Sequence, residues 1–230
     1  MRIFEPIKPR FLRLKNYFCV CLAVCFLFLF TACQSNVDYF TYVSELRSNI
    51  FRVETDDFSL RIFAVEKEYP YATDGVAREK SARTEIYLVA PSGDKTCSIA
   101  FTVNNQEYGG EMSYDNVKAE YYYSCSLEIS ALTFIDCTLT YGESVSTFHV
   151  PSVKTETTIS PQTALGLLQT AETELFNSLT DKYGFAGEIY LRLIYEESPY
   201  YYIGVIDRNG NTTAFLLNAE TGKILAKRQS

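Results

Sequence analysis

The sequence predicts an α+β protein that is mostly β. An antiparallel β-sandwich is expected over residues 50–150, followed at residues 161–230 by a small domain in which a helix covers an antiparallel sheet. Three observations favour this class. Tyrosine and phenylalanine are abundant, with 18 and 16 copies; apolar side chains alternate with a period of two through much of the chain; and one helical stripe follows residue 160.

Residues 1–32 have the pattern of a secretory signal peptide. Residues 1–15 carry five Lys or Arg against one Glu, and residues 17–30 are uncharged and rich in Phe, Leu, Val and Cys. A spanning helix needs about 20 apolar residues, and this run is shorter. The N-terminus therefore predicts export rather than a membrane span.

The end of this signal, Thr31-Ala32-Cys33, resembles a bacterial lipobox. The resemblance implies that the Cys33 thiol carries lipid and that the mature chain lies on the extracytoplasmic face of the cell membrane. Phe30 departs from the lipobox pattern, which has a smaller residue more often at that place. An ordinary signal peptide, or an uncleaved anchor with an incidental Cys, is the alternative.

The charge of the mature chain limits its partners. Removal of residues 1–32 leaves 16 Lys or Arg and 27 Asp or Glu, a net charge of −11. This charge disfavours nucleic acid and electrostatic docking on anionic lipid. We therefore expect membrane attachment through the lipid on Cys33, and no nucleic-acid partner.

Residues 33–49 are expected to form the lipidated N-terminus with a short helix or tether. Asn36 and Asp38 are candidate caps, because short polar side chains accept from the first amides of a helix. The apolar residues that roughly follow one helical face are Phe40, Val43, Leu46 and Ile50.

Short strands separated by turns predict the sandwich. Pro91-Ser92-Gly93-Asp94 is a turn in which proline fixes φ and glycine accepts a positive φ. Alternation of apolar and polar residues marks the strands, and seven antiparallel strands of this kind are typical of an immunoglobulin-like sandwich. The expected strands are 58–64, 83–90, 96–104, 107–113, 117–130, 134–141 and 144–150.

Three cysteines remain after the lipidation site: Cys97, Cys125 and Cys137. Each alternates in phase with the apolar residues of its strand, so each is expected to point into the sandwich. Two interpretations are open: an inter-sheet disulfide, as in immunoglobulin domains, whose pairing the sequence does not define, or three buried thiols. The core tryptophan of true immunoglobulin domains is missing, since the chain has no Trp. The spacing matches no zinc site, and no other metal or cofactor is expected.

A polar segment bracketed by prolines, residues 151–160, is the expected linker. Ser160-Pro161 then predicts a helix start, and an apolar stripe predicts one helix that ends near Gly184. Asn209-Gly210 predicts a two-residue type I′ hairpin, which would pair Ile203 with Leu216 and place Gly204 opposite Phe215. The stripe consists of Leu165, Leu168, Ala171, Leu175 and Leu179.

The order helix, strand, tight hairpin and a closing Asn218-Ala-Glu-Thr-Gly222-Lys-Ile-Leu225 resembles the PepSY domain of secreted and membrane-attached bacterial proteins. The usual motif begins with Asp, which Asn218 replaces. The resemblance covers residues 160–227, about the last third of the chain. It implies a non-enzymatic interaction or regulatory module, proposed in some members to restrain peptidases, and it brings no catalytic residues.

No catalytic residue is predicted. His149 is the only histidine, and no Gly-x-Ser-x-Gly motif accompanies it, so a solvated histidine at a strand end is expected. Asp207–Asn211 superficially resembles a calcium loop but lacks its distal Glu. The triplets at 121–123 and 200–202 present tyrosines to opposite faces, which makes Tyr122 and Tyr201 candidate ligand contacts.

These observations predict a lipid-anchored, non-catalytic protein of the cell envelope. Its function would be to bind or regulate an envelope protein partner, such as a peptidase, through its PepSY-like module. The alternative is a surface binder of a small ligand or cell-wall glycan that uses exposed tyrosines.

Overall fold

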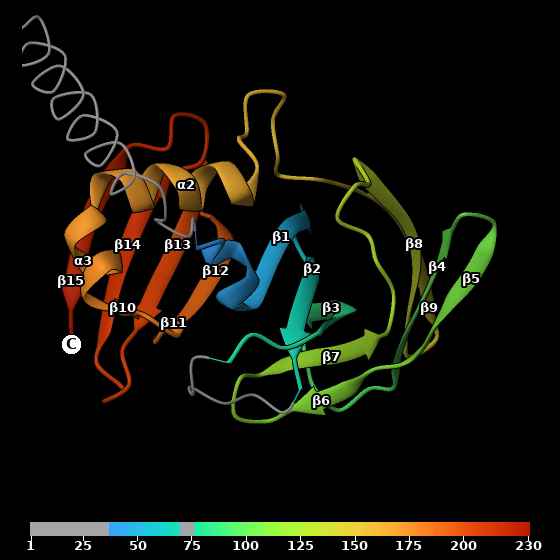
Figure 1. Ribbon diagram of the computed structural model, residues 1–230. Coiled ribbons are helices and arrows are strands. Elements are labelled where there is room, and N and C mark those ends of the chain that lie inside the picture. The colour runs from blue at the N-terminus through green and yellow to red at the C-terminus, as the bar shows by residue number, and fades with distance from the viewer. Residues whose placement is uncertain (1–36, 70–75) are drawn as a thin grey trace, which may run out of the picture. The chain divides into compact units, whose positions relative to one another are not determined.

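The computed structural model describes residues 37–69 and 76–230, and within them Asp38–Ser230 form one unit that contains two main sheets (Figure 1). The larger sheet has nine strands, in the spatial order β15 (Ile224–Gln229), β14 (Thr212–Asn218), β13 (Pro199–Ile206), β12 (Glu188–Tyr195), β1 (Val43–Glu54), β2 (Ser59–Glu68), β3 (Lys80–Val89), β7 (Glu120–Cys125) and β6 (Ser113–Asp115). The smaller sheet has the order β5 (Gln106–Glu111), β4 (Cys97–Val103), β8 (Phe134–Tyr141) and β9 (Ser144–Pro151). The remaining elements are η1 (Tyr39–Tyr42), α2 (Pro161–Ala171), α3 (Thr173–Ser178), β10 (Thr180–Asp181) and β11 (Gly184–Phe185).

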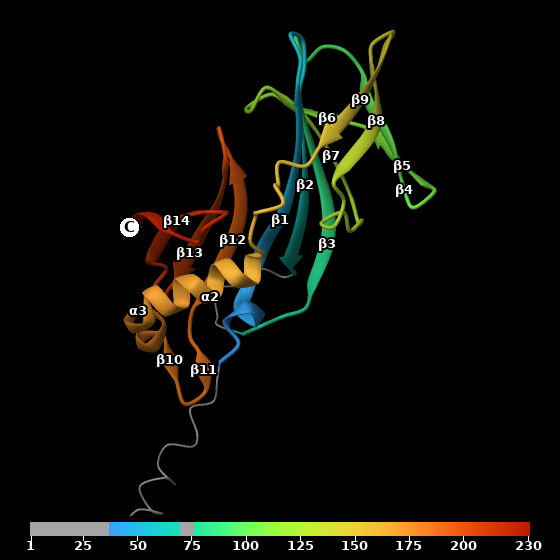
Figure 2. The same cartoon turned by 90° about the horizontal axis from the view of Figure 1, so that it is seen from above.

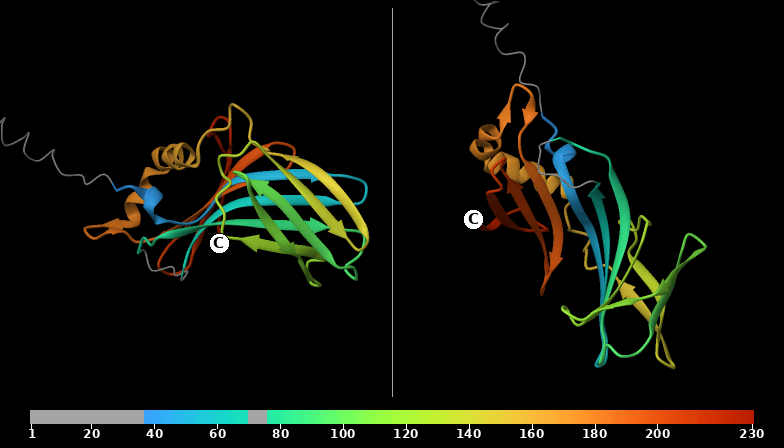
Figure 3. Two further views of the ribbon diagram at one scale, coloured as in Figure 1. Left: turned by 90° about the vertical axis from the view of Figure 1, so that its right-hand side faces the viewer. Right: turned by 90° about the horizontal axis from the view of Figure 1, so that it is seen from below.

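The four-stranded sheet packs on the β1-β2-β3-β7 part of the large sheet and forms a sandwich (Figure 3). An isolated bridge between Phe51 and Ser152 joins the two layers along one side. Strand pairs are antiparallel throughout except for one parallel pair, so the prediction of a mostly β, antiparallel sandwich-like fold is confirmed for the described residues. The core side chains with less than 2% exposure include Phe51, Leu60, Ile62, Ile86, Leu88, Ile129 and Leu139.

Strand β1 is central to the large sheet. It pairs antiparallel with β2 on one side and parallel with β12 on the other, where Val43 lies opposite Ile189 and Leu46 opposite Leu191. The two regions that the sequence separates at residues 151–160 therefore share one continuous sheet. The intervening segment is tied to both regions, because Val153 N donates to Ile50 O and Ile159 N donates to Ala219 O, each at 2.9 Å.

The segment expected to hold a short helix is mostly strand. Only η1 is helical, and Asp38 caps it by accepting from Phe40 N at 3.0 Å. A bulge between Arg47 and Asn49 shifts the phase of β1. The spacing of apolar residues across the bulge imitates a helix, which explains why the sequence misleads here. Residues 33–36 lie outside the described residues.

The helix predicted to end near Gly184 is shorter and divided. Ser160 caps α2 as expected, since its Oγ accepts from Thr163 N at 3.1 Å. The chain leaves helical geometry at Glu172, where φ is −116° and ψ is 38°, and resumes in α3. The Thr173 hydroxyl donates to the carbonyls of Gln169 and Thr170, and such local bonds compete with helix continuation.

The hairpin register also differs from the predicted one. Gly204 lies opposite Ala214 and Ile203 opposite Phe215, one residue away from the expected pairs. The loop has three residues because the Asp207 carboxylate accepts from the amides of Asn209 and Asn211, and only Gly210 has a positive φ (84°). A type I′ turn needs a positive φ at both central residues. The shift moves Phe215 onto the helix-covered face, so its ring does not cover Gly204.

The two faces of the large sheet have different surroundings. The register places α2 and the four-stranded sheet on the same face, α2 over β12–β14 and the small sheet over β1, β2, β3 and β7 (Figure 2). Among the described residues, no helix or sheet covers the opposite face, which we call the open face. Side chains of the open face include Glu45, Arg47, Arg61, Phe63, Lys67, Glu85, Tyr87, Tyr122, Tyr190, Arg192, Tyr200 and Tyr202.

Candidate binding face

Ion pairs cross-link neighbouring strands of the open face. The Glu45 carboxylate of β1 accepts from Arg192 of β12 at two points, Nε at 2.7 Å and Nη2 at 2.9 Å. This bidentate geometry fixes the planes of both groups and is stronger than a single contact. Two further pairs are Lys67–Glu85 at 2.9 Å and Arg61–Glu120 at 2.6 Å.

A row of aromatic rings crosses strands β2, β3 and β7 on the same face. The ring centroids are 5.5 Å apart for Phe63 and Tyr87, and 5.0 Å apart for Tyr87 and Tyr122. The cations of Arg61 and Lys118 lie 6.0 and 5.9 Å from the Tyr87 centroid. Burial raises the pKa of Tyr87, and the nearby Glu85 carboxylate, which accepts from its hydroxyl at 3.2 Å, raises the pKa further. Tyr87 is therefore a neutral hydrogen-bond donor at physiological pH.

The structure places Tyr122, one of the candidate ligand contacts, in a surface hollow of about 370 Å³ at the β7 end of this row. Aromatic faces with adjacent carboxylate and ammonium groups are suited to sugars and other polar ligands. The hollow is lined by Tyr87, Ser113, Tyr114, Asp115, Lys118, Glu120 and Tyr122.

Tyr201, the other candidate ligand contact, is not accessible to a ligand, so this prediction is wrong. Its side chain is 0% exposed, faces α2, and donates from its hydroxyl to Ile159 O at 2.7 Å. Burial raises the pKa of this hydroxyl. The alternation of strand faces was predicted, but the covered face is set by the helix, so Tyr200 and Tyr202 are the partly exposed members of this triplet.

The three cysteines are free thiols in the structure. Cys97 lies opposite Tyr141, and Cys137 lies opposite Phe101, so the two are four residues apart along adjacent strands. That offset corresponds to about 13 Å, beyond the roughly 7 Å over which a disulfide can close. Burial raises the pKa of Cys97 to about 11 and that of Cys137 to about 12. Cys97 and Cys137 therefore agree with the second interpretation, in which buried thiols act as small apolar side chains, whereas Cys125 is only partly buried.

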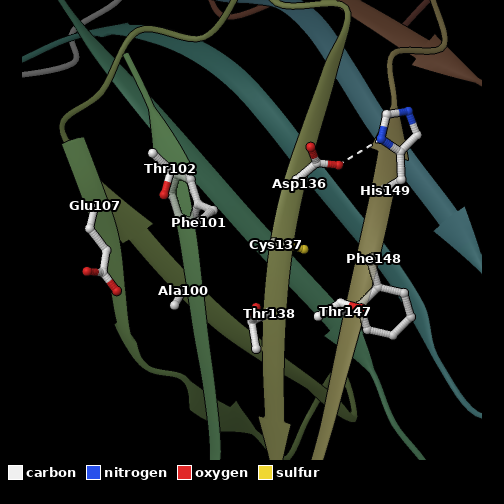
Figure 4. Close-up of a pocket in the computed structure, with 10 residues that line it drawn as sticks. All are labelled: Ala100, Phe101, Thr102, Glu107, Asp136, Cys137, Thr138, Thr147, Phe148 and His149. Carbon is white, nitrogen blue, oxygen red and sulfur yellow. Dashed lines mark hydrogen bonds and ion pairs between the residues drawn. The ribbon is translucent and has the colours of Figure 1, made fainter. Parts of the chain in front are cut away.

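The four-stranded sheet carries a separate hollow of about 510 Å³ on its outer surface (Figure 4). In it, His149 of β9 and Asp136 of β8 point toward one another, with 2.7 Å between Nδ1 and Oδ1. Both are largely exposed, at 63% and 70%. Within the described chain no hydroxyl group hydrogen-bonds to this histidine, and the buried Cys137 thiol is poorly ionised. The pair therefore lacks the activated nucleophile of a hydrolytic site.

The loops that resemble functional motifs have structural roles. Asn218 Oδ1 accepts from the amides of Glu220 and Thr221 at 3.0 and 2.8 Å, which closes the turn that resembles PepSY. Gly222 has a φ of 69°, and a Cβ at this position would lie 2.2 Å from Leu167 Cδ1. The motif thus allows the turn at residues 218–223 to pack closely against α2. In residues 37–69 and 76–230, no group of three or more His, Cys, Asp or Glu could hold a metal ion.

The expected signal peptide and Cys33 lie outside the described residues. Across the two described ranges, no helix combines the length and the apolar character that crossing a membrane requires.

Comparisons with known proteins do not define a family. No protein-family model matches the chain, and neither the curated proteins nor the solved structures include a significant match.

The sequence does not predict the charged and aromatic network of the open face. Its members come from β1, β2, β3, β7 and β12, which are separated by up to about 150 residues in the chain. The available signal was local: Arg61, Phe63 and Lys67 share one phase of a strand whose other phase is apolar.

Proposed function

We propose that this protein is a lipid-anchored, extracytoplasmic, non-catalytic protein that binds an envelope protein partner through its open face. The observation that carries the proposal is the open face itself, where aromatic rings and cross-strand ion pairs lie without a covering layer among the described residues. Aromatic residues and arginine are enriched at protein interfaces.

The C-terminal region contributes directly to this face. Tyr190 and Arg192 of β12 and Tyr202 of β13 continue the row that begins on β1–β3. The helix-on-sheet arrangement of residues 161–230 supports the PepSY resemblance, from which we infer that the partner is a protein that the module regulates, such as a peptidase. An immunoglobulin-like relationship for the sandwich remains a prediction.

Membrane attachment follows from the lipobox resemblance. Lipidation of Cys33 would add at least two acyl chains, and each buried CH₂ contributes about 0.8 kcal/mol to anchoring. Cys33→Ala should therefore move the protein to the soluble or secreted fraction, measured by fractionation and immunoblotting. Retention of the variant in the membrane, with no loss of metabolic lipid label, would contradict the lipoprotein assignment.

Site-specific crosslinking in intact envelopes tests the partner. A photo-crosslinking amino acid at Tyr202, on the open face, should trap a defined protein that mass spectrometry identifies. The same group at Thr147, on the outer surface of the four-stranded sheet, is the matched control and should trap that protein much less. Equal yields at both positions, or no protein adduct at Tyr202, would refute docking through the open face.

A second candidate function is the binding of a cell-wall glycan or small ligand in the hollow beside Tyr122. It is favoured by that hollow alone, because three half-buried tyrosines lie next to Asp115 and Lys118. Glycan-array binding that is lost in Tyr122→Ala would support it. Tyr183→Ala is the control, since this tyrosine is 83% exposed on the β10–β11 hairpin; equal losses in both variants would contradict a specific site.

A further inference from the structure

The guanidinium group of Arg47, on the open face, has no carboxylate within ion-pair distance among the described residues. Arg47 projects from β1 with its guanidinium 4.2 Å from the centroid of the Phe63 ring. Its Nε, like that of Arg61, is buried and has no hydrogen-bond acceptor among the described residues. A buried donor without an acceptor is unfavourable and needs an explanation.

The neighbouring cations of Arg47 each have a carboxylate partner, which Arg47 lacks. Across the β1–β12 pair, Arg192 lies directly opposite Arg47 and uses its Nε and Nη2 edge to bind Glu45. Lys67 and Arg61 on the next strand also have carboxylate partners. Arg47 has the same planar guanidinium as Arg192, but no side chain of the described residues provides a carboxylate for it.

The electrostatic surroundings agree with an incomplete site. Burial lowers the pKa of Arg47, and the positive charge of Arg192 lowers it further, although Glu45 and Glu85 act in the opposite direction. The folded chain therefore keeps this cation in a place that disfavours its charge. An incoming anion would relieve both effects.

We propose that Arg47 is the recognition point for a carboxylate of the protein partner, and that the partner docks through an acidic, extended segment. This inference rests on the proposed function, because it specifies the chemistry of the partner of the open face. The guanidinium would bind the carboxylate through its two Nη groups, because its Nε is buried and out of reach of a ligand. The Phe63 ring, 4.2 Å away, would add a cation–π contact to the guanidinium.

The spacing of cations indicates the length of the segment. Val65 separates Arg47 from the exposed Arg83 in one row of the sheet. Two strand spacings place these positions about 10 Å apart, which corresponds to three residues of a polyproline II segment, in which the side chains of residues i and i+3 point to the same side. A partner segment with acidic residues at positions i and i+3 would meet both cations.

A protein segment fits this face better than an anionic polysaccharide. A regularly charged polymer is best bound by a run of unpaired cations, whereas Lys67, Arg61 and Arg192 already have carboxylate partners. Charge complementarity is thus restricted to the Arg47–Arg83 row, and the surrounding aromatic rings favour apolar side chains between the acidic ones.

The test is selection of random 12-residue peptides displayed on phage against the full-length chain in detergent. We expect enrichment of Asp and Glu at a spacing of three residues. A selected peptide, synthesised with a fluorescent label, should bind Arg47→Gln about 10- to 100-fold more weakly in an anisotropy titration. Arg47→Lys keeps the charge but loses the planar fork, so its binding should be intermediate.

Arg228→Gln is the matched control, because Arg228 is exposed on β15 of the same sheet face and far from β1. It should bind the peptide as the unchanged protein does. Thermal melting separates recognition from folding, since Arg47→Gln should keep a cooperative transition. If Arg47→Gln did not fold, Arg47→Lys and Arg83→Gln would carry the comparison, and both should weaken binding.

Absence of acidic enrichment, or equal peptide affinity of Arg47→Gln and Arg228→Gln, would overturn the inference. Arg47-dependent binding of an oligogalacturonate, without peptide binding, would assign the site to an acidic glycan and would also overturn it. The crosslink at Tyr202 distinguishes the two proposals. A partner trapped equally by Arg47→Gln would refute the role of Arg47 alone, whereas no partner in the unchanged protein would refute the proposed function.

Discussion

The continuous sheet predicts that the sandwich and the C-terminal region unfold together. Leu217 tests this, because its side chain on β14 is 0% exposed and lies two strands beyond β12, on the side away from the sandwich. Truncation to alanine in Leu217→Ala removes buried apolar contacts and leaves a cavity, at a cost of about 3 kcal/mol. With a urea dependence of about 2 kcal/mol per molar, the midpoint should fall by about 1.5 M.

Unfolding is measured in the sandwich, which does not contain the substituted residue. Cys97 and Cys137 lie in the sandwich core and are 2% and 4% exposed, so alkylation in urea followed by peptide mass spectrometry reports the opening of the sandwich. Far-ultraviolet circular dichroism reports the loss of strands in the whole chain. In Leu217→Ala, both midpoints should fall together by the same amount.

The control is Leu225→Ala, since Leu225 is on the adjacent edge strand β15 and is 48% exposed. This change should shift both midpoints by less than about 0.3 M, because an exposed substitution changes stability by roughly 0.5 kcal/mol or less. An unchanged midpoint for Cys97 alkylation in Leu217→Ala, with circular dichroism split into two transitions, would refute the coupling through β1.

Three other predictions concern local features. Gly222→Ala should lower the free energy of unfolding by about 2 kcal/mol in urea titrations, because φ is 69° and the new Cβ would meet Leu167; an unchanged midpoint would contradict the turn geometry. Tyr201→Phe should cost about 1 kcal/mol, since the partly buried Ile159 carbonyl loses its donor, and a stabilised variant would argue against that bond. The pKa of Cys137 is raised from 9.0 to about 12, so its contribution to stability is complete below pH 9 and is lost as the pH rises toward 12; the unfolding midpoint of Cys137→Ala should therefore depend less on pH in this window.

Local patterns predicted much of the strand content because each strand with one buried face shows the period of two. The expected strand 134–141 matches β8 without error, and Cys137, Leu139 and Tyr141 are buried as their phase indicates. Strand β1 was missed for the opposite reason. Its bulge changes the phase, and the neighbouring side chains of Ile50 and Phe51 are both buried, at 4% and 0% exposure, so the alternation of buried and exposed residues disappears there.

The candidate sites also depend on contacts between distant parts of the chain, which local sequence patterns do not contain. The sequence predicts that Tyr122 and Tyr201 are each alternate members of a triplet, but it does not contain the position of α2, which buries Tyr201. Asn209-Gly210 favours a two-residue turn, whereas the Asp207 carboxylate stabilises a three-residue loop through two backbone amides. The unpaired guanidinium of Arg47 depends on β12, a distant strand, and no local pattern predicts it.

The parallel pairing of β1 has a consequence for the order of events during synthesis. Val43 meets Ile189, a residue that is made 146 positions later. At about 5–20 residues per second, one edge of β1 stays without its neighbour for roughly 7–30 s, while the strands of the sandwich already exist. A nascent chain in this interval exposes a twelve-residue strand edge to other chains. A chaperone that shields extended segments until β12 emerges would therefore raise the yield of folded protein.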